Sequence, residues 1–169
     1  MTTDTLTEAS LHELAAQLGQ CLTEKNMKLA AAESCTGGWL AKIITDLPGS
    51  SVWFEGSIVS YSNALKHGIL GVSTTILDEF GAVSGETVRA MNDGVVANTD
   101  ADIAVSISGI AGPGGGSPDK PVGLVWLCWG QRGKSKQASA FHFKGDRQAV
   151  RLQSIEKALV LLLALLHYQ

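Results

Sequence analysis

Residues 28–47, with the sequence KLAAAESCTGGWLAKIITDL, carry a strand pattern, a turn and a helix pattern in succession. The apolar run at residues 28–32 predicts a short buried strand, and residues 39–47 predict a helix that Pro48-Gly49 ends. The polar, glycine-containing residues 34–38 lie between them. A strand that leads through a turn into a helix is typical of α/β domains, whose ligands often bind at such turns.

The same alternation of helix and strand patterns continues on both sides of this stretch. Helical spacing predicts helices at residues 6–25, 62–70, 73–80, from Ser84 to about residue 98, and from Asp146 onward. Strand patterns occupy residues 52–61, 103–108, 122–129 and 137–143. The last two strands flank a turn at residues 131–133, which predicts a hairpin and hence a mixed sheet. We expect a layered α/β fold and, because no linker or repeat is visible, one domain over residues 1–169.

Composition narrows the classes of function. The net charge of −3 argues against broad nucleic-acid binding, and the apolar run at residues 158–166 is too short to span a membrane. That run indicates either a buried helix face or a contact between subunits, through Leu159, Leu162, Leu163 and Leu166 of a homo-oligomer. Three scattered cysteines form no CxxC pair, and the first ten residues do not resemble a signal peptide, so we expect a reduced, cytoplasmic protein.

The turn at residues 34–38 contains the first candidate for chemistry. Ser34 follows the predicted strand and precedes a helix, so backbone N–H groups at the helix start could stabilise a developing oxyanion. Gly37 and Gly38 would let a substrate approach the backbone closely. The alternative is that Ser34 or Thr36 only caps the helix. Cys35 is a second candidate nucleophile, although no histidine is an evident partner for it.

A nucleophilic serine needs a base, and Lys66 is the candidate. The four histidines occupy contexts that do not suggest a catalytic triad. A lysine can act as base when burial or a nearby cation lowers its pKa. Lys66 follows a predicted strand by one helical turn, and Tyr61 could relay the proton. The alternative is a solvated surface lysine.

Two further segments could bind a ligand. The loop from Gly109 to about Pro121, which follows the predicted strand ending at Ser108, is rich in glycine but matches neither a P-loop nor a GxGxxG fingerprint. Its backbone amides could line a phosphate or a carboxamide, or it could be a flexible surface loop. Arg147 and Arg151 share one face of the last predicted helix, where they could hold a phosphate or form surface ion pairs with Asp146 or Glu156.

Together these segments resemble the CinA C-terminal domain family. The resemblance covers the chain from about residue 10 to the end, and the motifs occur in the family's order. They are Ala32-Glu33-Ser34-Cys35-Thr36-Gly37-Gly38, Tyr61-Ser62-Asn63 with Lys66, Gly71-Val72, Gly81-Ala82-Val83-Ser84 with Glu86-Thr87-Val88, Ser108-Gly109-Ile110-Ala111-Gly112-Pro113, Lys120-Pro121-Val122-Gly123 and Gly145-Asp146-Arg147.

The resemblance implies a three-layer α/β/α sandwich and an amidohydrolase that uses neither metal nor cofactor. Its expected reaction converts the small nucleotide nicotinamide mononucleotide and water to nicotinic acid mononucleotide and ammonia. The family pattern makes Ser34 the nucleophile and Lys66 and Tyr61 its activating partners. The expected substrate-binding residues are Thr36, Gly37, Gly38, Ser108, Gly109, Gly112 and Arg147. The competing hypothesis is a non-catalytic nucleotide-sensing module linked to competence or DNA-damage responses.

Overall fold

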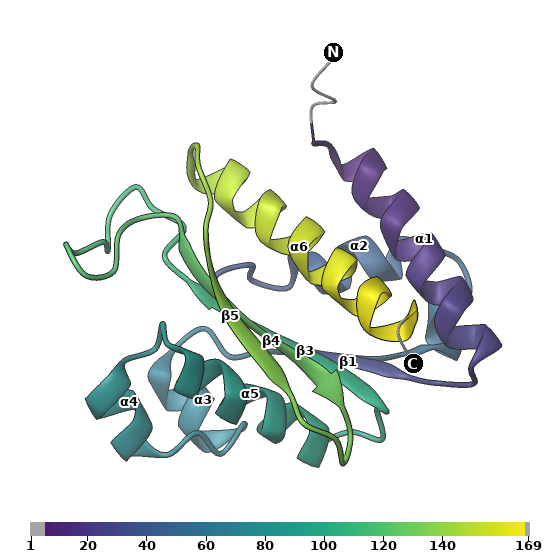
Figure 1. Ribbon diagram of the computed structural model, residues 1–169, viewed down its shortest axis with the longest axis horizontal. Coiled ribbons are helices and arrows are strands. Elements are labelled where there is room, and N and C mark those ends of the chain that lie inside the picture. Colours follow the sequence, from purple (N-terminus) through teal and green to yellow (C-terminus); the bar gives the residue numbers. More distant parts are fainter. Residues whose placement is uncertain (1–5, 168–169) are drawn as a thin grey trace.

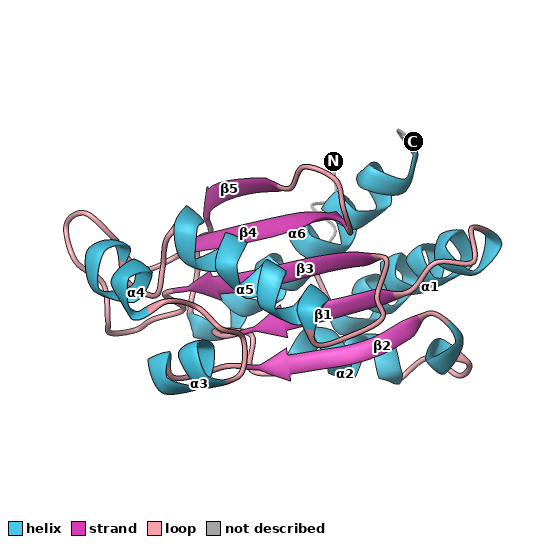
Figure 2. Ribbon diagram, turned by 90° about the horizontal axis from the view of Figure 1, so that it is seen from below, coloured by secondary structure: helices cyan, strands magenta, loops and turns pink. Residues whose placement is uncertain are grey.

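The computed structural model describes residues 6–167, which form a five-stranded sheet between two layers of helices (Figures 1 and 2). The elements, in chain order, are α1 (Glu8–Glu24), β1 (Leu29–Glu33), α2 (Trp39–Thr45), a 3₁₀ turn (Ser50–Val52), β2 (Phe54–Val59), α3 (Asn63–Gly68), α4 (Thr74–Phe80), α5 (Gly85–Ala97), β3 (Ile103–Gly109), β4 (Leu124–Gln131), β5 (Gln137–His142) and α6 (Arg147–His167).

The sheet is mixed, as the predicted hairpin requires. Its strand order is β2-β1-β3-β4-β5. Strands β1, β2 and β3 are parallel, whereas β4 pairs antiparallel with both β3 and β5. The carboxyl ends of the three parallel strands therefore meet at one edge of the sheet (Figure 2). Ligands of open α/β sheets bind at this edge.

The side chains of β1 alternate between two cores, which explains why this strand has no polar residue before Glu33. Leu29 and Ala31 pack under α1, α2 and α6, whereas Ala30 and Ala32 pack against α5 on the opposite face. All four side chains are buried, as is usual for a central parallel strand covered on both faces. Helices α1, α2 and α6 form one layer in Figure 1, and α3, α4 and α5 form the other. The three-layer prediction is thus confirmed.

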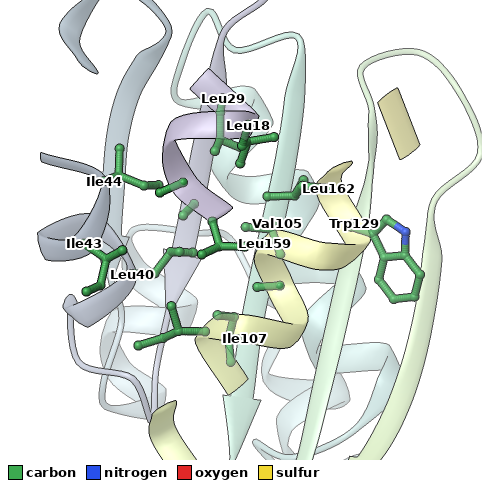
Figure 3. Close-up of a cluster of buried hydrophobic side chains, with 14 of the residues drawn as sticks. Leu18, Leu29, Leu40, Ile43, Ile44, Val105, Ile107, Trp129, Leu159 and Leu162 are labelled. Atoms are coloured by element: carbon green, nitrogen blue, oxygen red, sulfur yellow. The ribbon is translucent and has the colours of Figure 1, made fainter. Parts of the chain in front are cut away.

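The apolar end of α6 is part of the protein's own core. Leu159, Leu162, Leu163 and Leu166 are buried in the cluster beneath α1, and Figure 3 shows Leu159 and Leu162 among side chains of the sheet and of α1. The expectation that these four leucines contact a second subunit is therefore wrong, because α1 and the sheet already cover them. The alternative of a buried helix face is confirmed. Among residues 6–167, no helix is long and apolar enough to cross a membrane.

Other differences concern the ends of strands. The strand expected at residues 52–61 is limited to Phe54–Val59, because Ser50–Val52 form a 3₁₀ turn. The strand expected from residue 122 begins at Leu124. Gly123 precedes it with a φ of +93°. This left-handed conformation interrupts the extended backbone and delays the strand.

Helix α5 packs against the chain at Gly94 so closely that a side chain there would collide with backbone. A Cβ at Gly94 would lie 2.0 Å from the carbonyl oxygen of Leu70, whereas one at Gly68 in α3 would meet no atom within 4 Å. We expect Gly94→Ala to lower the free energy of unfolding by about 1–3 kcal/mol through overpacking. Gly68→Ala, the matched control, should be neutral or stabilising by up to about 1 kcal/mol. Urea denaturation of both variants tests this, and equal stabilities would contradict the packing described.

Candidate active site

A cavity of about 190 Å³ opens where β1, β2 and β3 end. It is lined by residues at or shortly after the ends of these strands, by the loop before α5 and by the first residue of α6. They are Ser34, Cys35, Tyr61, Lys66, Ala82, Val83, Ser108, Gly109, Ala111 and Arg147. Of the residues predicted from sequence, the fold brings Ser34, Tyr61, Lys66, Ser108, Gly109 and Arg147 to this cavity. Thr36, Gly37, Gly38 and Gly112 are not among its lining residues.

Ser34 and Lys66 form a buried pair at the base of the cavity. The Nζ atom of Lys66 lies 2.8 Å from the Oγ atom of Ser34 and 2.8 Å from the carbonyl oxygen of Ser60. Lys66 is only 1% exposed, so it is not a surface lysine, and Ser34 is 7% exposed. Among the described residues, no carboxylate forms an ion pair with Lys66. Burial without a counter-ion lowers the pKa of the Lys66 ammonium below its ordinary value.

The position of Lys66 follows from local structure. Ser62 caps α3 by accepting a hydrogen bond from the backbone N–H of Leu65. The cap starts the helix three residues after β2 ends, which directs the first turn of α3 back toward the end of β1. The carbonyl groups of Ser60 and Tyr61, at 2.8 and 3.5 Å, then accept from the Lys66 amine and hold it in place.

Neither Ser34 nor Thr36 caps α2, so the capping alternative is wrong. The N-cap residue is Gly38, which has no side chain to offer. The buried carboxylate of Glu33 takes that role, because it accepts the backbone N–H groups of Gly38, Leu40 and Ala41. Sequence reasoning missed Glu33, although a charged residue at the end of an otherwise apolar strand was a usable signal.

Cys35 is a poor nucleophile in this environment. Its side chain is buried, and burial raises the pKa of the thiol to about 11. The side chain is therefore a thiol rather than a thiolate at neutral pH.

Tyr61 and Arg147 lie together at the mouth of the cavity. The Tyr61 side chain is 60% exposed, and its hydroxyl accepts a hydrogen bond from Nη2 of Arg147 at 3.2 Å. Nη1 of Arg147 donates to the carbonyl oxygen of Gly112 at 2.9 Å. Only the backbone carbonyl of Tyr61 approaches Lys66. Arg147 also borders a neighbouring hollow of about 500 Å³, whose other lining residues are Trp39, Asp146, Gln148 and Arg151.

Arg151 holds the turn that carries Ser34. Its Nε donates to the carbonyl oxygen of Cys35 at 3.0 Å and its Nη2 to that of Thr36 at 2.8 Å. The guanidinium also lies over the Trp39 ring, 5.0 Å from the centroid. The alternative of a surface ion pair with Asp146 or Glu156 is wrong for Arg151, because its guanidinium donates hydrogen bonds to the backbone carbonyls of the turn.

Most other predicted binding residues use their polar groups within the protein. The Thr36 hydroxyl donates to Glu33 at 2.7 Å, and the Ser108 hydroxyl donates to the carbonyl of Ala82 at 2.7 Å. The amide of Gly37 donates to the carbonyl of Ser34 at 3.0 Å. Gly109 is required by packing, since a Cβ there would lie 2.6 Å from the Val125 side chain. Within residues 6–167, no group of three or more His, Cys, Asp or Glu side chains is arranged to hold a metal ion.

Several curated proteins are similar to this chain over most of its length. The chain is 50% identical over 149 residues to a nicotinamide-nucleotide amidohydrolase PncC of Enterobacter agglomerans, covering 88% of this chain and 91% of the relative. It is 47% identical over 154 residues to the protein of the same name from Escherichia coli K12, covering 91% and 93%. It also spans 34% of a longer CinA-like protein of Syntrophomonas wolfei, at 49% identity over 142 residues, which is 84% of this chain.

Solved structures show the same fold. The crystal structure of the competence/damage inducible protein CihA from Agrobacterium tumefaciens superposes with a TM-score of 0.89 at 39% identity, covering 92% of this chain and 94% of that one. A CinA superfamily protein of Klebsiella pneumoniae matches with a TM-score of 0.90 at 34% identity, covering 94% and 99%. The family model of the CinA C-terminal domain matches residues 11–166, and the chain belongs to this family.

Proposed function

We propose that this protein is a serine amidohydrolase that converts nicotinamide mononucleotide and water to nicotinic acid mononucleotide and ammonia. The observation that carries the proposal is the 2.8 Å approach of Lys66 Nζ to Ser34 Oγ in a buried cavity. A hydroxyl beside a buried amine is a nucleophile with its base in reach. The amidohydrolase class and the nucleotide are supported by relatives of that name at about half identity over most of both chains.

The first half of the reaction forms an ester. Neutral Lys66 takes the proton of the Ser34 hydroxyl while Ser34 Oγ attacks the carboxamide carbon of the nicotinamide ring. The carbonyl double bond opens to an oxyanion, which reforms the double bond as the C–N bond breaks. Lys66 returns the proton to the leaving nitrogen, and ammonia departs.

The second half consumes water. Lys66 takes a proton from a water molecule, whose oxygen attacks the ester carbon. The bond to Ser34 Oγ then breaks, and Ser34 recovers its proton from Lys66. The products are the acid nucleotide and the restored enzyme. Only the neutral amine of Lys66 can accept a proton, and burial lowers the pKa of the Lys66 ammonium. The neutral fraction of Lys66 therefore rises as the pH rises through this pKa, and the reactivity of Ser34 rises with it.

Two backbone amides are the proposed donors to the oxyanion. Within residues 6–167, the N–H groups of Cys35, Ala82, Val83 and Ala111 donate to no other residue, and all four residues line the cavity. Cys35 and Ala111 are chosen because Cys35 directly follows Ser34 and Ala111 lies in the loop after β3. Gly37 and Gly38 are excluded because their amides bind Ser34 and Glu33. One donor from the residue after the nucleophile and one from a neighbouring loop is a recurrent arrangement in serine hydrolases. Such donors often supply a large share of the catalytic effect.

The volumes of the cavity and of the neighbouring hollow support a placement in which each takes a different part of the nucleotide. Sites that enclose a whole drug-sized ligand measure about 300–1,000 Å³. The 190 Å³ cavity therefore takes the ring with its carboxamide, and the ribose phosphate extends past Arg147 toward the 500 Å³ hollow. Arg147 is the residue common to both, and its guanidinium suits a phosphate. Tyr61, bonded to Arg147, would border the ribose in this placement rather than relay a proton.

Ser34→Ala tests the nucleophile, with Cys35→Ala as its neighbour control. We expect Ser34→Ala to lower kcat/KM by about a thousandfold or more, because the attacking atom is lost. Cys35→Ala should keep activity within about tenfold, because the buried thiol takes no part. Purified proteins are incubated with nicotinamide mononucleotide and a chelator, and both ammonia and the acid are followed. Activity lost only in Cys35→Ala would transfer the role to the cysteine. Binding without turnover by the unmodified protein would favour the nucleotide-sensing alternative.

Lys66→Met tests whether the charged form of the buried Lys66 amine destabilises the folded protein. We expect the variant to be inactive but more stable than the unmodified protein at pH 7, by on the order of 1 kcal/mol. Lys66 binds a proton more tightly in the unfolded chain than in the folded protein, because folding lowers its pKa. The free energy of unfolding of the unmodified protein therefore rises with pH until the pH reaches the ordinary lysine pKa. The advantage of Lys66→Met should therefore shrink as pH rises. Thermal unfolding at several pH values measures this, and an advantage that grows with pH would contradict it.

A further inference from the structure

Glu33 is the most heavily hydrogen-bonded side chain near the cavity, and the reaction as proposed does not use it. It is the last residue of β1 and is fully buried. Its two oxygens accept five hydrogen bonds of 2.7–3.1 Å. Oε2 accepts from Thr36 Oγ1 and the amides of Gly38 and Leu40, and Oε1 accepts from the amide of Ala41 and from Ser57 Oγ.

Three of these donors are orphan groups of a helix start. The first N–H groups of any helix have no partner within it, and a buried one without an acceptor is costly. The N-cap of α2 is a glycine, so no side chain at the cap can serve them. Glu33 serves them from the preceding strand, while Ser57 joins the same carboxylate to β2. The start of α2 is thereby fixed relative to the two strands that flank the cavity.

The fixed helix start also determines where the Cys35 amide points. The chain reaches α2 through Gly37 and Gly38, whose φ values of +61° and +90° produce a tight turn. In this turn the amide of Gly37 binds the carbonyl of Ser34. The C=O and N–H groups of one trans peptide point in opposite directions. The N–H of Cys35, which shares its peptide with the Ser34 carbonyl, therefore points away from the turn and keeps no partner in another residue among residues 6–167.

We propose that Glu33 is a positioning residue for catalysis: its carboxylate holds the turn between β1 and α2 so that the Cys35 amide donates to no other residue and can serve as an oxyanion donor. This inference rests on the serine reaction proposed above and adds a role that the reacting atoms do not reveal. Glu33 is not among the residues that line the cavity. Its contribution should therefore appear when charge develops on the substrate oxygen, and only weakly when the uncharged carboxamide binds.

Glu33→Gln is the test, because it keeps the shape of the side chain and removes one acceptor. The introduced carboxamide can present oxygen at only one of the two positions, so donors at the other meet an NH₂ group. We expect kcat for nicotinamide mononucleotide to fall roughly 10- to 100-fold while KM changes less than about threefold. Pyridine-3-boronic acid, which forms an anionic tetrahedral adduct with a serine, should lose inhibitory affinity by a factor similar to that of kcat.

Two comparisons separate positioning from a loss of folded protein. Glu55→Gln makes the same chemical change on β2, where Glu55 pairs with Lys28, and should retain the kcat of the unmodified protein. Thr36→Val removes one of the five donors to Glu33 and should lower kcat by about threefold to tenfold, with Thr36→Ser restoring it. The Thr36 pair decides the question if Glu33→Gln does not fold.

The outcomes distinguish this role from the proposed function itself. A parallel loss of kcat and boronate affinity at nearly constant KM supports positioning by Glu33. If kcat falls but the inhibition constant of the boronate does not change, Glu33 only maintains the folded fraction and the inference is overturned. Activity equal to that of the unmodified protein in Glu33→Gln, or in Thr36→Val where Glu33→Gln cannot be purified, overturns it as well. An unmodified protein that neither deamidates the nucleotide nor binds the boronate would reject the serine reaction and this inference together.

Discussion

A carboxylate buried at the end of a central strand connects the parts of this structure that form the site. Strand β1 lies in the middle of the parallel half of the sheet, and Glu33 at its end binds β2 through Ser57 and α2 through three backbone amides. Arg151 of α6 donates hydrogen bonds to the carbonyl oxygens of Cys35 and Thr36 in the same turn. Glu33 and Arg151 thus both hold the turn at residues 34–38. Within residues 6–167, the contact with Lys66 is the one hydrogen bond of the Ser34 side chain.

Lys66 presents the opposite situation, a buried amine with no carboxylate partner in the described chain. A protein seldom retains such a residue for stability, because desolvation penalises its charged form. Sites of catalysis are where pKa values shifted in this way concentrate. The buried polar groups of β1 and α3 therefore differ in how well they are compensated. The carboxylate of Glu33 accepts five hydrogen bonds and holds the turn in place. The amine of Lys66 has no ionic partner within residues 6–167, and in the proposed reaction it exchanges a proton with Ser34.

Local patterns predict the layered α/β domain, the mixed sheet and Lys66 as a candidate base for Ser34, and the family resemblance adds the three-layer arrangement and the catalytic roles. Period-2 and helical spacing place Ser34 and Lys66 just beyond the ends of strands, and parallel strands bring such positions to one edge. The contacts of Arg151 with the turn bridge 116 and 115 positions, and no local pattern records them. Spacing alone also does not tell whether an apolar helix face such as that of Leu159 meets its own core or a second subunit. Side-chain direction is equally hidden: the family resemblance implies that Thr36 binds substrate, whereas its hydroxyl donates to Glu33 in the structure.

In the proposed reaction, Ser34, activated by Lys66, carries the acyl group during turnover. Mass spectrometry of protein quenched in acid during steady turnover of nicotinamide mononucleotide would detect this group on the protein. The peptide that contains both Ser34 and Cys35 would be fragmented to locate the adduct. We expect an acid-stable ester of the nucleotide on Ser34 that is absent from Lys66→Met. An adduct on Cys35, or an adduct on Ser34 that forms equally fast without Lys66, would contradict it.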